Sequence, residues 1–315
     1  NQHIELARQK PGTEILFLLL KREQPVQERN FFQKMIYGER SPYRELPISS
    51  WRTEDSLILV EEYTPYEVSE RKMLSFPLSQ LAFSDPEKCL LSKRFLLGTD
   101  LYGRDLLSRL MIGARVSLSV GFIAVLISLL IGISLGAVAG FFRGWLDNLI
   151  IWIINVVWSI PTLLLVIAIT FALGKGFWQV FIAVGLTMWV EVARVVRGQI
   201  LSIREKEFVE AGRALGFKNF RIIFRHILPN IMGPVIVISA ANFASAILIE
   251  AGLSFLGIGV QPPMPSWGTM IKENYAYIIL DSAYLAILPG LAIMLMVLAF
   301  MVVGNGLRNA LDVKA

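Results

Sequence analysis

Long stretches without a charged residue constrain the fold of this 315-residue chain more than any other feature. Four of the five stretches exceed the roughly 20 residues that a helix needs to cross the hydrocarbon layer of a bilayer. The third reaches that length only if its helix continues past Glu191. Lipid offers the backbone no hydrogen-bond partner, so all five are predicted to be membrane-spanning helices. They cover residues 116–142, 149–174, 176–190, 227–249 and 282–307.

Composition and charge exclude several other classes of protein. Hydrophobic residues make up 55% of the chain and charged residues 17%, which is too apolar for an ordinary soluble domain. The net charge of +5 does not indicate a nucleic-acid partner, because the basic residues gather in one segment. Residues 194–225 hold eight Lys or Arg against three Glu, and this excess predicts that the segment is cytoplasmic. Cys89 is the only cysteine, so neither an intrachain disulfide nor a zinc site is expected.

Residues 1–95 differ in composition from the rest of the chain. They are rich in charged, aromatic and proline residues, and their apolar run at 15–20 is far too short to cross a bilayer. The alternating pattern of residues 56–61 predicts a strand. Counting spans outward from the cytoplasmic segment places residues 1–95 outside the membrane, as a polar extracytoplasmic region. Residues 96–315 are then expected to form a transmembrane domain.

The cytoplasmic segment 205–230 carries its own amphipathic pattern. The triplet Glu-Ala-Gly at 210–212 is followed after three residues by Gly216, and then by a basic and apolar run that ends in Leu-Pro. This pattern resembles the EAA loop of permease subunits from binding-protein-dependent ABC importers, although Gly212 replaces an alanine of the family motif and His226 an isoleucine. The resemblance implies a short helix, a glycine turn and a second helix, which together dock on an ATPase subunit.

Three further segments resemble the same family, in the family's order along the chain. Residues 97–109 are similar to its LGTDxxGRD segment, and residues 250–268 to its SLSFLGLGVQPPxPSWG segment. Residues 304–312 are similar to its GDGLRDALDP ending, with Asn305 and Asn309 in place of aspartates. The resemblance implies an all-α integral membrane protein with the type I ABC importer (MetI-like) transmembrane fold, similar to C-type permeases of the dipeptide, oligopeptide and nickel group. It also implies that a further membrane helix precedes the five spans of this chain.

The residues of the coupling loop, 198–229, have distinct expected roles. Side chains at helical spacing form an apolar face for an ATPase groove, with Glu210 and Arg213 as polar anchors beside it. Gly216 allows a positive φ between the two helices. The alternative is an amphipathic loop that lies on the lipid surface. The candidate residues are the apolar Phe208, Ala211, Leu215, Phe220, Ile223 and Phe224, together with Glu210, Gly212, Arg213, Ala214 and Gly216.

Polar groups in the spans are candidates for a translocation path. An unsatisfied polar group is costly in lipid, so each should face protein or a wet cavity. Hydrogen bonding between helices is the alternative for each of them. Glu250, at the external mouth, is expected either to meet a positively charged peptide amine or to organise the glycine-rich turn that follows it. The candidates are Asn155, Ser159, Pro161, Asn242, Ser245 and Glu250.

Local features predict how the spans bend and pack. Glycines recur every four residues from Gly132 to Gly140 and permit the close approach of another helix. Pro161 lies in the middle of its span, where it kinks a helix either beside a pore or for packing alone. Glu191 and Arg194 are one turn apart and can pair near the cytoplasmic interface.

The resemblance implies a multi-subunit importer in a bacterial inner membrane. It predicts a multi-pass permease in contact with lipid, a second, B-type permease, two ABC ATPase subunits and an extracytoplasmic substrate-binding protein. Short peptides are the implied substrate, while nickel, another small solute, or a non-transporting scaffold of the same fold are alternatives. The chain is not expected to be an enzyme or to bind a cofactor or metal. Residues 212–218 lack the spacing of a phosphate loop, so ATP and Mg²⁺ are assigned to the partner ATPase.

Overall fold

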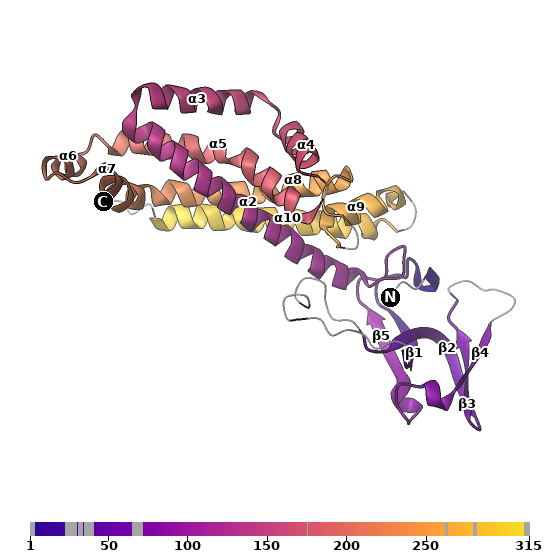
Figure 1. The fold of residues 1–315 in the computed structure, drawn as a ribbon. Coiled ribbons are helices and arrows are strands. Elements are labelled where there is room, and N and C mark those ends of the chain that lie inside the picture. Colours follow the sequence, from indigo (N-terminus) through magenta and orange to yellow (C-terminus); the bar gives the residue numbers. More distant parts are fainter. Residues whose placement is uncertain are drawn as a thin grey trace. The chain divides into compact units, whose positions relative to one another are not determined.

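The chain divides into two compact units. The computed structural model describes residues 4–22, 30, 34, 41–64, 72–174, 176–261, 264–279 and 282–311. The sheet unit comprises Asn1–Gly113 and Asn274–Leu285, and the helical unit comprises Ala114–Glu273 and Ala286–Ala315. The long helices α2 (Leu106–Phe142) and α10 (Tyr284–Leu311) each begin in the sheet unit and continue through the helical unit (Figure 1).

The sheet unit is built on a five-stranded antiparallel sheet with the order β4-β3-β2-β1-β5 (Figure 1). The strand predicted at residues 56–61 is confirmed as β3. The apolar run 15–20 belongs to β1, an inner strand that pairs with both β2 and β5. The strands are β1 (Thr13–Leu20), β2 (Arg44–Glu54), β3 (Leu57–Glu62), β4 (Met73–Pro77) and β5 (Leu90–Phe95).

Side chains from one face of the sheet form a core of their own. Successive residues of a strand point to opposite faces, so Leu18, Ile48 and Ile58 from three neighbouring strands can pack together. Val60 and Cys89 are fully buried in the same cluster. Four short 3-10 helices lie in the described part of this unit, namely η1 (Ile4–Leu6), η2 (Leu78–Gln80), η3 (Glu87–Cys89) and η6 (Tyr275–Ile278).

The turn and helix predicted at residues 97–109 are both present. Gly98 and Gly103 adopt positive φ, at 79° and 68°, before α2 begins at Leu106. A Cβ on Gly98 would lie 2.2 Å from the carbonyl oxygen of Gln9, so only glycine fits there. The buried carboxylate of Asp100 accepts hydrogen bonds from Arg104 Nε at 2.6 Å and Arg109 Nη1 at 2.5 Å. Asp100 therefore ties the turn to the first turns of α2.

The helical unit contains the membrane spans. Four described helices are long and apolar enough to cross a bilayer, and they correspond to four of the five predicted spans. The helices of this unit beside α2 and α10 are α3 (Gly144–Ser159), α4 (Thr162–Leu173), α5 (Phe177–Ile203), α6 (Glu207–Ala214), α7 (Asn219–Arg221), α8 (Met232–Phe255) and α9 (Trp267–Asn274). The prediction of an all-α membrane domain is confirmed.

The remaining predicted span, 149–174, is not one continuous helix. It is split into α3 and α4, which meet at an angle of 95° (Figure 1). Ile160 and Pro161, between the two helices, have ψ angles of 128° and 124°, far from the helical region. Proline disfavours a helical conformation in the residue before it and lacks the N–H that would continue the helix. The expected kink is therefore a complete break, and this pair forms a fifth span only if both helices are counted together.

Close packing between α2 and α5 follows from the glycine repeat. A Cβ on Gly132 would lie 2.5 Å from Cβ of Val192, and a Cβ on Gly136 would lie 2.5 Å from the carbonyl oxygen of Ala193. Neither distance leaves room for a side chain. The prediction that these glycines permit a close helix approach is therefore confirmed.

Candidate functional site

The segment between α5 and α8 folds as a helix, a glycine turn and a second helical segment. Helix α6 ends in a Schellman motif, in which Phe217 N–H donates to the Gly212 carbonyl at 3.0 Å and Gly216 N–H donates to the Arg213 carbonyl at 2.9 Å. Gly216 adopts the left-handed φ of 75° that this motif requires. Helix α7 then continues through η4 (Ile222–Ile227), a π-helical segment, and η5 (Leu228–Ile231) into α8.

One face of this loop packs inward. Val209 of α6 and Ile222 of η4 are buried in a cluster with Ile200 of α5. Gly212 lies on the same face, where a Cβ would meet Phe217 Cδ2 at an ordinary contact distance of 3.5 Å. The alanine that the family motif has at this position therefore fits the structure without a clash.

The opposite face leaves large apolar side chains in solvent. Phe208 is 41% exposed, Leu215 72%, Phe220 71% and Phe224 55%. The rings of Phe220 and Phe224 lie with their centroids 4.2 Å apart. The remaining candidate residues that are also exposed are Glu210, Ala211, Arg213, Ala214 and Gly216.

Ile223 departs from the expected exposed face. It is 6% exposed and belongs to the inward-facing cluster with Ile222. The reason is the π-helical conformation of 222–227, which changes the angular step between residues from that of an α-helix. Spacing that assumes 3.6 residues per turn therefore assigns Ile223 to the wrong side of the segment.

Polar contacts hold this loop against the ends of α2 and α3. Arg204 Nη1 donates to the Phe141 carbonyl at 2.7 Å, and Arg143 Nη2 forms an ion pair with Glu205 at 2.8 Å. Burial lowers the pKa of Arg204, and the positive charges of Arg143 and Arg213 lower that pKa further. These contacts anchor the loop to the adjoining ends of α2 and α3.

A second ion pair joins the C-terminal part of α5 to the beginning of α3. The guanidinium of Arg197 donates to both carboxylate oxygens of Asp147, at 2.6 and 2.8 Å. A bidentate pair of this kind fixes orientation as well as distance. Together with the contacts of Arg204, it links the loop to three membrane helices.

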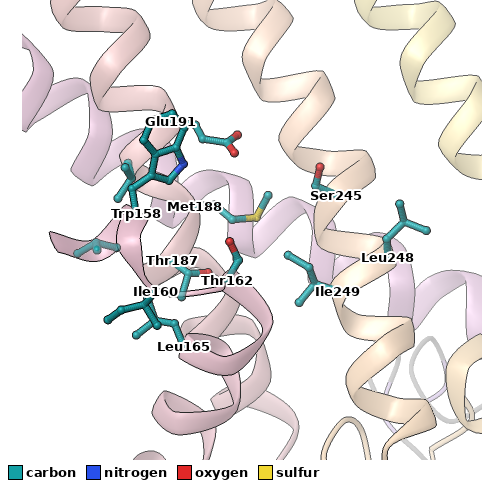
Figure 2. A pocket seen from close by; sticks show the side chains of 12 residues that line it. Trp158, Ile160, Thr162, Leu165, Thr187, Met188, Glu191, Ser245, Leu248 and Ile249 are labelled. Carbon is teal, nitrogen blue, oxygen red and sulfur yellow. The ribbon is translucent and has the colours of Figure 1, made fainter. Parts of the chain in front are cut away.

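A cavity of about 330 Å³ lies beside the break between α3 and α4 (Figure 2). Its wall is completed by α5 and α8, and four of its lining residues are polar. These are Thr162, Thr187, Glu191 and Ser245. The apolar part of the lining is Val157, Trp158, Ile160, Leu165, Met188, Val190, Leu248 and Ile249.

The candidates for a translocation path divide around this cavity. Ser245 lines it, and Pro161 lies between the lining residues Ile160 and Thr162. Two others make local contacts outside the lining. Asn155 Oδ1 accepts a hydrogen bond from Arg194 at 3.3 Å, and Ser159 Oγ donates to the carbonyl of Val156 at 2.7 Å.

Asn242 and Glu250 are buried elsewhere in α8. Neither side-chain polar atom of Asn242 has a hydrogen-bond partner among the described residues. Glu250 is 0% exposed and accepts hydrogen bonds from Ser254 Oγ at 2.6 Å and Ser117 Oγ at 3.5 Å. Ser254 Oγ in turn accepts the N–H of Val260 at 3.2 Å. Through Ser254, Glu250 is therefore in contact with the glycine-rich turn.

Glu191 is a cavity residue that the sequence analysis did not place in the path. Helix α5 continues to Ile203, so Glu191 lies midway along it and not near its C-terminal end. Arg194 does not pair with it, because the guanidinium lies 3.5 Å from the ring centroid of Trp158 and donates to Asn155. The sequence contains a signal for this position. The charge-free run 176–190 is too short to cross a bilayer, so a spanning helix has to include Glu191.

Similarity to known proteins identifies the family. Residues 132–315, more than half of the chain, match the family described as binding-protein-dependent transport system inner membrane component. The chain is 40% identical to the dipeptide transport system permease protein DppC of Alkalihalophilus pseudofirmus over 82% of this chain and 83% of that protein. It is 41% identical to the glutathione transport system permease protein GsiD of Pectobacterium atrosepticum over 69% of this chain and 72% of that protein. It is 43% identical to the di/tripeptide transport system permease protein DppC of Pseudomonas aeruginosa over 79% and 80%.

A solved structure has a similar fold. The MetNI methionine ABC transporter, in inward-facing conformations, matches with a TM-score of 0.56 and 18% identity, over 66% of this chain and 98% of that chain. The fold and its apolar helices define a multi-pass transport permease. The chain belongs to the family of binding-protein-dependent transport system inner membrane components. Among the described residues, no group of three His, Cys, Asp or Glu side chains could hold a metal ion.

Proposed function

We propose that this permease carries short peptides and is driven by a separate ATPase that docks on the loop at residues 198–229. The observation that carries the coupling assignment is the exposed face of that loop. Four large apolar side chains, together with Glu210 and Arg213, are exposed on a segment whose other residues pack inward. An exposed apolar patch with polar residues at its edge is typical of a protein docking surface.

The contacts behind the loop support a mechanical role for it. Arg204, Arg143 and Arg197 connect the loop and its preceding helix to α2 and α3. A movement imposed on the exposed face is therefore transmitted to the membrane helices as a whole. Closure of two ATPase subunits on ATP and Mg²⁺ would re-orient the spans, and no ATP need bind to this chain.

The names of the relatives support the proposed substrate class. Relatives at about 40% identity are named as dipeptide, di/tripeptide and glutathione permeases, and all of these solutes are short peptides. The proposed complex has this chain, a second B-type permease, two ABC ATPases and an extracytoplasmic substrate-binding protein. We assign residues 1–95 to the extracytoplasmic side, where the sheet would contact the binding protein. Nickel or another small solute is the alternative cargo, and a non-transporting scaffold is the alternative role.

The direct test is ATP hydrolysis by the co-purified four-subunit complex in lipid, titrated with short peptides in the presence of the binding protein. Stimulation by particular peptides is expected. Assembly without stimulation by any peptide would overturn the peptide assignment, and nickel chelates would be titrated next. Absence of stimulation by either would favour the scaffold.

A charge reversal on the docking face tests coupling separately from substrate choice. Glu210→Lys is expected to leave membrane insertion intact while ATP hydrolysis no longer drives uptake, because Glu210 is exposed and has no structural role in the described residues. Uptake and ATP hydrolysis are measured together in proteoliposomes. Unchanged uptake by Glu210→Lys would show that the ATPase docks elsewhere.

A further inference from the structure

Glu191 is an acid in the middle of a membrane helix, and it lines the cavity in Figure 2. An ionisable side chain at this depth is costly unless it meets an opposite charge or lines an aqueous space. In Figure 2 its carboxylate extends toward the side on which the hydroxyl of Ser245 lies, and the side chain of Met188 is drawn between and below them. The position of Glu191 indicates that a cation or hydrogen-bond donor for its carboxylate comes from outside the neighbouring helices.

Two other acids of the helical unit show how a carboxylate can be paired in this fold. Asp147 is held by two hydrogen bonds from Arg197, and Glu250 by the hydroxyls of Ser254 and Ser117. Among the described residues, none donates a hydrogen bond to the carboxylate of Glu191 or forms an ion pair with it. The nearest cation along the helix, Arg194, is held by Asn155 and Trp158.

Two hydroxyl groups of the same cavity are also without a partner. The side chains of Thr162 and Ser245 make no hydrogen bond with any described residue, whereas Thr187 Oγ1 donates to the Val184 carbonyl. An otherwise apolar cavity with a few convergent polar groups is the usual form of a small-ligand site. At about 330 Å³ the volume is at the lower end for such sites, which suits a ligand of dipeptide size.

We propose that this cavity binds the primary ammonium group of a short peptide through the carboxylate of Glu191. An ammonium has three N–H donors and no acceptor, and the cavity offers a carboxylate and the two hydroxyl oxygens of Thr162 and Ser245 as acceptors. The apolar wall then faces the remainder of the peptide. This assignment rests on the proposed function and adds to it a specific contact in the path.

A direct binding experiment separates this site from transport itself. The full chain is placed in lipid nanodiscs without partner subunits, because all lining residues belong to this chain. Binding is followed by saturation-transfer NMR with three probes. Dialanine carries a free α-ammonium, N-acetyl-dialanine carries none, and Nα-acetyl-lysine carries only a side-chain ammonium.

The expected result is that Glu191→Gln weakens dialanine binding by about tenfold or more, the loss expected for a hydrogen bond to a charged group. N-acetyl-dialanine should bind wild type and variant equally weakly. Glu54→Gln, which neutralises an exposed acid of β2, is the matched control and should bind dialanine as wild type does. If Nα-acetyl-lysine also depends on Glu191, the site accepts any primary ammonium, and otherwise it selects the peptide terminus.

Three outcomes would overturn the proposal: no dialanine binding to wild type, equal binding of the acetylated probe, or unchanged affinity in Glu191→Gln. If no probe with an ammonium group binds, and Glu191→Gln no longer co-purifies with the second permease, Glu191 would instead form an ion pair with a basic residue of that subunit. The comparison of acetylated and free probes on wild type decides the question even if the variant misfolds. Peptide-dependent ATP hydrolysis of the complex is scored independently, so failure of import and failure of this site are distinguishable.

Discussion

The loop at residues 198–229 and the cavity are two surfaces of the helical unit that leave different groups without a partner. The loop exposes phenylalanine and leucine side chains among charged residues. The cavity exposes one carboxylate among apolar side chains. In our proposals, the loop receives an apolar surface of the ATPase and the cavity receives the ammonium group of a peptide. In these proposals, apolar side chains bordered by charged residues bind a protein, whereas one charged residue bordered by apolar side chains binds a small ligand.

The largest expected effect is on the loop. Leu215→Asp should weaken binding of the ATPase by about 2–4 kcal/mol, because a charge replaces one of the most exposed apolar groups of the face. Affinity is measured between the permease complex in lipid and the purified ATPase. Leu96→Asp makes the same chemical change at an exposed leucine of the sheet unit and serves as the control. Equal losses in both variants would contradict the docking face.

Adjacent residues of η4 allow the inward and outward faces to be separated. Ile223→Ala should lower folding stability by about 2 kcal/mol or more, because the side chain is buried in the core under the loop. Phe224→Ala should leave the thermal midpoint almost unchanged and weaken ATPase binding instead, because its ring is exposed. Thermal denaturation and ATPase affinity are measured for both. The reverse pattern would show that the π-helical segment is turned the other way.

The two glutamates Glu250 and Glu191 provide the corresponding test for the membrane region. Glu250→Ala should destabilise the chain by about 1–3 kcal/mol, because it leaves buried serine hydroxyls without their acceptor. Glu191→Ala should not destabilise it, since no described residue pairs with that carboxylate. Thermal stability of both variants in the same lipid gives the comparison. A greater loss for Glu191→Ala would mean that this acid is structural.

The smallest expected effect restores the family residue at Gly212. Gly212→Ala should stabilise α6 by about 0.5–1 kcal/mol, because alanine has the higher helix propensity and its Cβ meets Phe217 at an ordinary distance. Coupled ATP hydrolysis should remain at the wild-type level. Gly216→Ala is the matched control and should destabilise the turn, because Gly216 has a positive φ and Gly212 does not. Destabilisation by Gly212→Ala would mean that the ring of Phe217 does not accommodate the added methyl group.

The loop was predictable in detail because its pattern is local. A helix, a glycine turn and a second helix each depend on residues within a few positions of one another. The prediction failed only at Ile223, where a π-helical segment replaced the assumed helical period. The membrane helices were likewise predicted, since the requirement for backbone hydrogen bonds in lipid leaves few alternatives.

The cavity was not predictable in the same way. Of the six predicted residues of the translocation path, Ser245 lines the cavity and Pro161 lies in the break between α3 and α4 beside it. Glu191 also lines the cavity but was not among the six. Burial of a polar group depends on which helices meet around it, and those neighbours are far away in the sequence. Glu250 and Glu191 both occur beside apolar runs in the sequence. They differ in the structure, because serine hydroxyls donate hydrogen bonds to Glu250 and no described residue pairs with Glu191.

By itself, the sequence determined the apolar spans, the strand at 56–61, the turn at 97–109 and the helix–glycine–helix loop, because each depends on short-range backbone and hydropathy constraints. The tertiary structure alone decided the 95° break at Pro161 and the packing that leaves one acid without a partner in a cavity. Proline marks where a helix can fail, but the packing of α4 against α5 sets the direction in which the chain turns. The satisfaction of each carboxylate is likewise a property of neighbouring helices, which short-range patterns do not encode.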